Sequence, residues 1–199
     1  MKEERKSMLI VISGPSGVGK GTIYSRLLDN DPSLTFSVSV TTRGPRQGEK
    51  DGVDYFFISE EKYQELVEQD AFLEHATVHG HSYGTLKSQI VEKMEKGLSV
   101  MLDIDPQGAR QVIAQWPECV SIFLLPPSYQ KLRERLYGRN TDDPGEIERR
   151  LNNARGEINQ VQMYQYAVVN DDLELAFAQV SAIIAAEKQR TNRYFPVVE

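Results

Sequence analysis

The chain has 199 residues, 40% of them hydrophobic, which is enough to bury one sizeable core and predicts a single domain. Lys and Arg number 23 against 29 Asp and Glu, a formal net charge of −6, which disfavours a protein that wraps nucleic acid or coats an anionic membrane. The single cysteine, Cys119, excludes an intrachain disulfide framework. No apolar stretch approaches the ~20 residues of a membrane span, and the first apolar stretch is too short for a secretory signal. We therefore expect a cytoplasmic protein without a membrane partner.

Short apolar runs alternate along the chain with amphipathic stretches of helical period. The runs predict buried strands at 9–12, 36–40, 98–102, 120–125 and 166–169. The amphipathic stretches predict helices at 20–28, 86–95, 106–115, 129–137, 146–162 and 173–188. This alternation indicates an α/β fold, built from right-handed βαβ units, with a parallel sheet flanked by helices. The stretch 55–78 breaks the alternation and predicts a small inserted α+β region.

A glycine-rich segment follows the first predicted strand and opens the first predicted helix. It consists of Gly14, Pro15, Ser16, Gly17, Val18, Gly19, Lys20, Gly21 and Thr22. This is the context of a phosphate-binding P-loop, in which backbone N–H groups surround phosphate oxygens and Lys20 supplies charge to the β- and γ-phosphates. A strict P-loop has Ser or Thr directly after the lysine to bind Mg²⁺. Because Gly21 stands there, we expect Mg²⁺ to be held through nucleotide and water, with Thr22 and Asp103 as candidate protein ligands.

Charged residues mark two further parts of the site. Asp103 and Asp105 follow the predicted strand 98–102, and the carboxyl ends of strands in an open α/β sheet face the ligand crevice. Asp105 also precedes Pro106, so a helix N-cap is an equal interpretation. Arg43 and Arg46 lie three apart in a loop constrained by Gly and Pro, which suits a bound phosphate. A solvated loop is the alternative there.

Taken together, these motifs resemble those of the guanylate kinase family. The resemblance lies in 39–55, 83–85, 103–108, 126–128, 135–141 and 169–172, in the family's order and approximate spacing. It covers about residues 8–188. It implies one domain with a P-loop kinase core (about 7–38 and 86–188), a GMP-binding insert (about 39–85) and a short lid (about 138–150).

The resemblance also implies roles for individual residues. The positions that match those holding the GMP phosphate are Ser39, Arg43, Arg46, Tyr55 and Tyr83. Glu74, Thr85 and Asp105 match positions that bind guanine, whose N1–H and N2–H can both donate to a carboxylate. Asn170 and Asp171 match positions beside the ATP adenine, although Asn-Asp is also a common turn pair. Arg139 and Arg150 match lid arginines, which makes Lys20, Arg46, Arg139 and Arg150 the expected catalytic residues.

The implied activity is transfer of the γ-phosphoryl group from ATP to GMP, with Mg²⁺, in purine nucleotide metabolism. GMP, and dGMP as a further acceptor, already carry an anionic phosphate oxygen, so no general base is expected. Two alternatives stay open. One is a kinase for another nucleoside monophosphate or a small phosphorylated sugar; the other is an inactive guanylate kinase-like module that binds peptides. The P-loop and lid arginines favour the enzyme, and the sequence leaves open whether it forms a homo-oligomer.

Overall fold

The computed structural model describes residues 6–78, 80–138 and 144–195 of the chain. Within these ranges, a central sheet of five parallel strands has the order β2-β7-β1-β8-β9. The strands are β1 (Leu9–Ser13), β2 (Leu34–Phe36), β7 (Ser99–Asp103), β8 (Val120–Leu125) and β9 (Tyr166–Val169). The predicted α/β fold with a parallel sheet is thereby confirmed.

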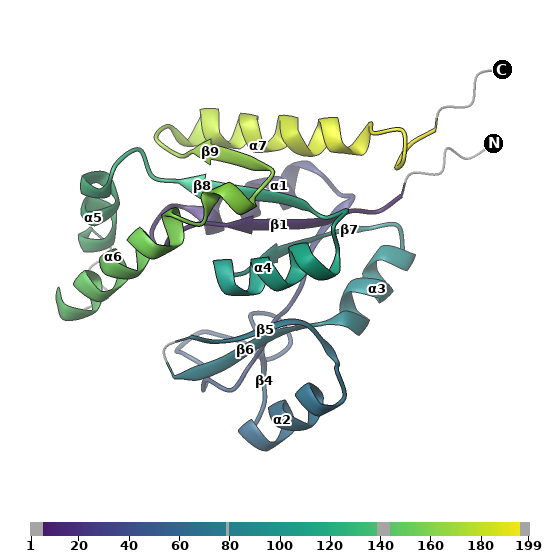
Figure 1. Cartoon of the computed structure of the whole chain (residues 1–199), viewed down its shortest axis with the longest axis horizontal. Helices are drawn as coiled ribbons and strands as arrows, with labels where there is room; N and C mark the ends of the chain where they lie inside the picture. The colour runs from purple at the N-terminus through teal and green to yellow at the C-terminus, as the bar shows by residue number, and fades with distance from the viewer. Residues whose placement is uncertain (1–5, 79, 139–143, 196–199) are drawn as a thin grey trace.

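Helices cover both faces of this sheet, as Figure 1 shows for α7 on one side and α4 on the other. The first layer contains α1 (Lys20–Asn30) and α7 (Leu173–Lys188), and the second contains α3 (Lys87–Glu95) and α4 (Pro106–Gln115). Ile10 and Ile12 of β1 pack with the first layer. Leu9 and Val11 pack with the second, because successive side chains of a strand point to opposite faces. Burial on both faces explains why these strands are continuous apolar runs.

Within the ranges that the structure describes, four helices begin at residues whose side chains cap them. Each capping oxygen accepts a hydrogen bond from the N–H group three residues ahead, which satisfies a donor that has no partner inside the helix. The caps are Ser59, Asp105, Ser128 and Asp172, before α2 (Glu60–Glu68), α4, α5 (Tyr129–Tyr137) and α7. In α4, Pro106 follows the cap at a position where its missing N–H costs nothing. The N-cap interpretation of Asp105 is therefore confirmed.

The insert has a small sheet of its own, which lies below α4 in Figure 1. Its strand order is β4-β3-β6-β5, and α2 packs against it through Tyr63 and Phe72. The strands are β3 (Val40–Thr41), β4 (Phe56–Phe57), β5 (Phe72–Val78) and β6 (His81–Leu86). Strand β5 also contacts α4 of the core, so the insert and the core meet along these two elements.

The prediction of one strand over 36–40 is wrong. Strand β2 ends at Phe36, and the Ser37 N–H still donates to Met101 of the core sheet (3.1 Å). Two residues later, the Ser39 carbonyl oxygen accepts from Phe56 of the insert (2.9 Å). The chain thus passes from one sheet to the other inside a single apolar run, and hydrophobic pattern alone does not locate such a crossing.

Helices α5 and α6 (Pro144–Ile158) pack against each other beside the carboxyl ends of the core strands. Their contact is made by Leu132 and Leu136 on α5 with Ile147 and Ala154 on α6. The helix predicted to continue to residue 162 ends at Ile158, and a short 3₁₀ turn follows at Val161–Met163. None of the helices in the described part of the chain is long and apolar enough to cross a membrane.

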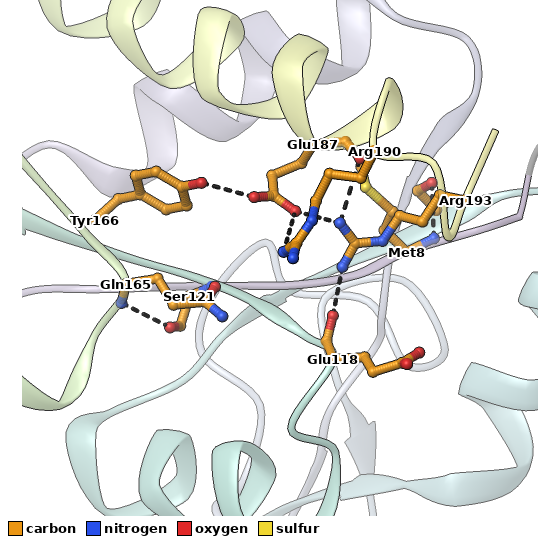
Figure 2. Close-up of polar contacts among 9 residues, drawn as sticks. Met8, Glu118, Ser121, Gln165, Tyr166, Glu187, Arg190 and Arg193 are labelled. Carbon is orange, nitrogen blue, oxygen red and sulfur yellow. Dashed lines mark hydrogen bonds and ion pairs between the residues drawn. The ribbon is translucent and has the colours of Figure 1, made fainter.

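A buried ion pair fixes the segment that follows α7, as Figure 2 shows. Arg193 pairs with Glu187, and both side chains are only 7% exposed. The Tyr166 hydroxyl donates to the other oxygen of Glu187 (2.6 Å), and Arg193 also donates to the carbonyl oxygen of Glu118 (2.5 Å). The Arg193 carbonyl accepts from Lys6 (2.9 Å). The C-terminal segment is therefore tied to β9, to the start of β8 and to the segment before β1.

Candidate active site

The loop between β1 and α1 has the backbone shape that the P-loop motif predicts. Gly14 and Gly19 have φ values of 151° and 103°, which L side chains rarely adopt. A Cβ atom at Gly14 would lie 2.4 Å from the carbonyl oxygen of Leu124, and one at Gly19 would lie 2.6 Å from the Asn170 side chain. In this structure Gly19 precedes α1 without a side-chain cap. The first N–H groups of the helix are thus available to an anion.

Lys20 and Asp103 lie together at the carboxyl ends of β1 and β7. The Lys20 ammonium donates to the Gly14 carbonyl oxygen (2.6 Å) and lies 3.9 Å from an Asp103 carboxylate oxygen. Surrounding protein raises the pKa of Asp103, and the charge of Lys20 opposes that rise. The Tyr24 hydroxyl contacts both strands, donating toward the carbonyl oxygens of Ile12 (2.6 Å) and Leu102 (3.0 Å). It helps to hold the two strand ends in register beneath the lysine.

A cleft of about 350 Å³, here called the insert cleft, lies between the P-loop and the insert. It is lined by Gly14, Ser16, Lys20, Ser39, Tyr55, Glu74, Ala76, Val78, Tyr83, Asp103, Ile104, Asp105 and Glu157. The fold thus gathers the P-loop lysine with residues from β5, β6 and the strand end of β7. Most of the residues that the sequence assigns to GMP line this one cavity.

Glu74 is a buried carboxylate at one end of the insert cleft, with 4% of its surface exposed. Burial raises its pKa to about 7; the hydrogen bond from Thr85 opposes the rise, and the charge of Asp105 adds to it. The Thr85 hydroxyl donates to Glu74 (2.6 Å) and is fully buried, so it orients the carboxylate from behind. On another side, a Cβ atom at Gly108 would lie 2.3 Å from Glu74. Glycine at the start of α4 therefore allows the carboxylate its position.

The insert cleft also presents hydroxyl groups. Ser39, Tyr55 and Tyr83 line it, and the two tyrosine rings lie 6.0 Å apart, edge to face. The Arg43 guanidinium lies 5.4 Å from the Tyr55 ring centre and forms an ion pair with Glu49 (2.9 Å), whose hydrogen bond raises the pKa of Arg43. Arg43 does not line the cleft, and Arg46 is exposed on the same loop.

A second cavity of about 430 Å³, here called the α5 cleft, lies on the other side of the P-loop. Asn170 and Asp171 line it, together with Thr22, Arg135 and backbone of the P-loop. The Asn170 amide donates to the Val18 carbonyl oxygen (2.8 Å). Arg135 donates to the carbonyl oxygens of Asn170 (2.8 Å) and Asp171 (3.3 Å). These bonds tie the P-loop to the loop that follows β9.

The described part of the expected lid lies close to the P-loop. Arg150 on α6 donates to the Ser16 hydroxyl (3.4 Å) and to Glu146 (3.2 Å). Arg149 and Arg133 pair with Glu146 and Glu148 on exposed surface, which agrees with an ion-paired solvated face for them. Arg139, the other predicted lid arginine, lies outside the described residues.

The described residues include no group of three or more His, Cys, Asp or Glu side chains placed to hold a metal ion. Mg²⁺ typically keeps several waters and binds through one or two carboxylates together with substrate phosphates. A single carboxylate beside the P-loop, that of Asp103, fits such a site. Thr22 lines the α5 cleft and Asp103 the insert cleft, so the two predicted candidates do not share one cavity.

The sequence interpretation missed two acidic residues of this region. Glu49 holds Arg43, but a loop acid six residues away has no periodic signal that predicts the pair. Glu157 lines the insert cleft from α6. It lies two helical turns after Arg150, and this spacing could have placed it on the same face. A larger cavity, about 490 Å³, lies around Lys6, Trp116 and Arg193 and includes no predicted site residue.

Comparisons with known proteins agree with this geometry. The family model described as guanylate kinase matches residues 6–187. A guanylate kinase of Clostridioides difficile is 45% identical over 194 residues, which cover 98% of this chain and 95% of that protein. One from Caldanaerobacter subterraneus is 48% identical, with 97% and 94% covered. The crystal structure of guanylate kinase from Anaplasma phagocytophilum superposes with a TM-score of 0.79 at 35% identity, covering 96% of this chain and 92% of that one. This chain therefore belongs to the guanylate kinase family.

Proposed function

We propose that the insert cleft binds GMP, that the P-loop and the α5 cleft bind ATP, and that the γ-phosphoryl group passes between them. The products are ADP and GDP. Family membership supports this assignment, because relatives named guanylate kinase match the chain over nearly its whole length. The chain is thus an ATP:GMP phosphotransferase of nucleotide metabolism.

The observation that favours GMP over other acceptors is the buried carboxylate of Glu74 in the same cleft as Lys20. A fixed carboxylate accepts hydrogen bonds from both N1–H and N2–H of guanine. Adenine presents a lone pair at N1, which would face the carboxylate and leave it unsatisfied. A buried polar group left without its partner costs about 1–3 kcal/mol, and more when it is charged. Asp105 lines the same cleft and is close enough to Glu74 for its charge to raise the pKa of that carboxylate.

The acceptor phosphate would then lie among the hydroxyl groups of Ser39, Tyr55 and Tyr83, which line the same cleft. Arg43 lies behind Tyr55, and Arg46 is exposed and able to turn toward an anion. Two guanidinium groups on one loop give the planar donor pairs that phosphate oxygens accept well. This arrangement supports the residue roles that the family resemblance implies.

Transfer requires positioning and charge neutralisation rather than a general base, since the attacking phosphate oxygen is already anionic. Lys20 would stabilise charge on the transferring group from the P-loop, and Arg150 is placed beside Ser16 to do so from α6. Arg46 and Arg139 complete the proposed catalytic set. Mg²⁺, bound with ATP near Asp103, would supply further positive charge to the β- and γ-phosphates. Closure of the α5–α6 region would exclude water, which otherwise competes for the phosphoryl group.

Release of ADP, measured with GMP, dGMP, AMP, CMP and UMP as acceptors, tests this function. We expect turnover with GMP and dGMP, and kcat/KM lower by ~10⁴-fold for acceptors that cannot satisfy Glu74. Higher activity with another nucleotide would support the alternative kinase, and no turnover with any of them would support the peptide-binding module. The cytoplasmic location, the lack of a nucleic-acid partner and the oligomeric state stay predictions.

A further inference from the structure

Glu157 is an acidic residue of the insert cleft that the proposed mechanism does not use. It lies on α6, seven residues after Arg150, with the buried Ala154 between them. Residues at i, i+4 and i+7 share one face of a helix. One face of α6 therefore places Arg150 beside Ser16 of the P-loop and Glu157 in the cleft with Lys20 and Asp105.

No residue in the described part of the chain forms a hydrogen bond or an ion pair with the partly buried Glu157 carboxylate. Burial raises its pKa; the charge of Lys20 opposes that rise and the charge of Asp105 adds to it. The carboxylate is thus within electrostatic reach of the P-loop lysine and of the guanine end of the cleft. Burial also raises the pKa of the Tyr164 hydroxyl; a hydrogen bond with Ser13 opposes that rise, and the charges of Asp105 and Glu157 add to it. This part of the cleft therefore holds the carboxylates of both Asp105 and Glu157.

The chemistry of GMP limits what can satisfy Glu157. A phosphate would be repelled by the carboxylate, and the guanine N–H donors are assigned to Glu74. The remaining donors of GMP are the ribose hydroxyls, which lie between the base and the phosphate. The ribose of ATP is an unsuitable partner, because the residues assigned to the adenine, Asn170 and Asp171, line the α5 cleft on the other side of the P-loop.

We infer that Glu157 accepts a hydrogen bond from a ribose hydroxyl of the acceptor nucleotide and thereby helps to select the sugar. The inference rests on the proposed function, since it requires guanine near Glu74 and the phosphoryl group near Lys20. It adds a role for α6: the helix that brings Arg150 to the donor phosphates would also contact the acceptor. Binding of the acceptor sugar would then favour the position of α6 that transfer needs.

The test compares kcat and KM for GMP, 2′-dGMP and 3′-dGMP in the wild-type protein and in Glu157→Ala and Glu157→Gln, at saturating Mg-ATP. A hydrogen bond to a charged group is worth roughly ten- to a hundredfold, so Glu157→Ala should lower kcat/KM for GMP by about that factor, mainly through KM. For the analogue that lacks the contacted hydroxyl, Glu157→Ala should lower kcat/KM by less than about twofold. Glu157→Gln keeps a carbonyl acceptor and should retain part of the activity lost in Glu157→Ala.

Glu148→Ala, on the exposed side of α6, is the matched control. Its kcat/KM values for the three acceptors should stand in the same ratio as those of the wild type. An equal loss for all three acceptors in Glu157→Ala would overturn the inference, and so would an unchanged kcat/KM for GMP. Glu157→Gln, close in shape to the native residue, keeps the test decisive if Glu157→Ala fails to fold. The GMP-to-AMP ratio of Glu74→Gln separately tests the proposed guanine site, so failure of the site and failure of the sugar contact give different results.

Discussion

Glu74 has three features that a base-selecting residue requires. It is buried, the Thr85 hydroxyl fixes its orientation, and its second carboxylate oxygen can accept from a base. Glu74→Gln converts one accepting oxygen into a donor, so one guanine N–H would face an amide N–H. Losing that charge-assisted bond should cost on the order of 2–4 kcal/mol in kcat/KM for GMP. AMP should improve relative to GMP, because the repulsion at N1 is relieved. Steady-state kinetics with both nucleotides measure this, and an unchanged ratio would show that Glu74 does not bind the base.

The raised pKa of Glu74 also predicts a pH dependence of kcat/KM for GMP, which should differ between the wild type and Glu74→Gln. Burial raises the pKa to about 7 from 4.5, so the carboxylate gains its charge as pH rises through 7. Only the charged form accepts from both guanine donors, and kcat/KM for GMP should therefore increase from pH 6 to pH 8 through this group. Glu74→Gln should lack that contribution, which separates it from titration of the GMP phosphate itself. Equal pH profiles for the two proteins would contradict this origin.

Lys20 is the first residue of α1 and its side chain lines the insert cleft rather than the core, so its loss should affect chemistry far more than folding. Removing an electrostatic contact to the transferring phosphoryl group lowers rates by ~10²-fold or more, so Lys20→Met should lose at least that much in kcat. The midpoint of thermal unfolding should stay close to that of the wild type. Lys96→Met, which removes an exposed lysine paired with Glu92 on the same turn, is the control for charge alone. Near-normal turnover of Lys20→Met would exclude the P-loop mechanism.

At the scale of elements, the P-loop, the capping residues and the alternating strands and helices could be predicted because each depends on neighbours along the chain. Asp105 and Pro106 predict the start of α4, and α4 begins there. The prediction of one strand over 36–40 was wrong for the opposite reason. The residues of this run belong to two different sheets, because Ser37 bonds to Met101 of the core and Ser39 to Phe56 of the insert. Both partners are distant in sequence. Glu49 is brought to Arg43 only by the folding of its loop. The spacing of Glu157 from Arg150 indicates a shared face of α6, but only the packing of that helix against the core brings the face to the cleft.

The α5–α6 element gives the lid prediction. Arg150 reaches the P-loop through Ser16 at 3.4 Å, a long contact to a neutral hydroxyl, and the transferring phosphoryl group would offer it a stronger, anionic acceptor. An interaction made chiefly in the transition state lowers kcat when it is removed and leaves substrate affinity nearly unchanged. Arg150→Met should therefore depress kcat strongly while the Kd for GMP changes little, and we expect the same of Arg139→Met. Weakened GMP binding without loss of kcat would assign the arginine to the acceptor site instead.

At the scale of the whole molecule, the site is formed where the core sheet, the insert and α6 meet, at the carboxyl ends of the core strands. The two described chain ends lie at the opposite, amino end of these strands (Figure 1). Glu118, Tyr166, Glu187 and Arg193 come together there. No local pattern predicts this cluster, because its members are separated by up to 75 residues. The sequence therefore predicts the nucleotide chemistry better than it predicts what holds the termini.

The cluster should contribute to stability without affecting catalysis. Arg193→Met would remove the buried ion-pair partner of Glu187 and leave only the Tyr166 hydroxyl and the more exposed Arg190 beside it, so we expect a cost toward the lower end of the roughly 3–5 kcal/mol of a broken buried pair. Burial raises the pKa of Glu187, but the hydrogen bonds from Tyr166 and Arg193 outweigh it and hold that pKa below its usual value. The stabilisation is thus present above the unfolded-state pKa and is lost as pH falls through the lower, folded-state pKa.

Denaturant unfolding at pH 7 should show the full decrease in the free energy of unfolding for Arg193→Met. The kcat for GMP should be unchanged where enough folded protein remains. The difference between the variant and the wild type should shrink as the pH is lowered below about 4.5, where Glu187 becomes neutral in the unfolded chain. Arg190→Met, which removes a guanidinium that is 55% exposed and 3.5 Å from the same carboxylate, should cost less than about 1 kcal/mol. If the two variants were equally stable, neither the ion pair nor the side-chain contact of Arg193 with Glu118 would be what fixes the C-terminal segment.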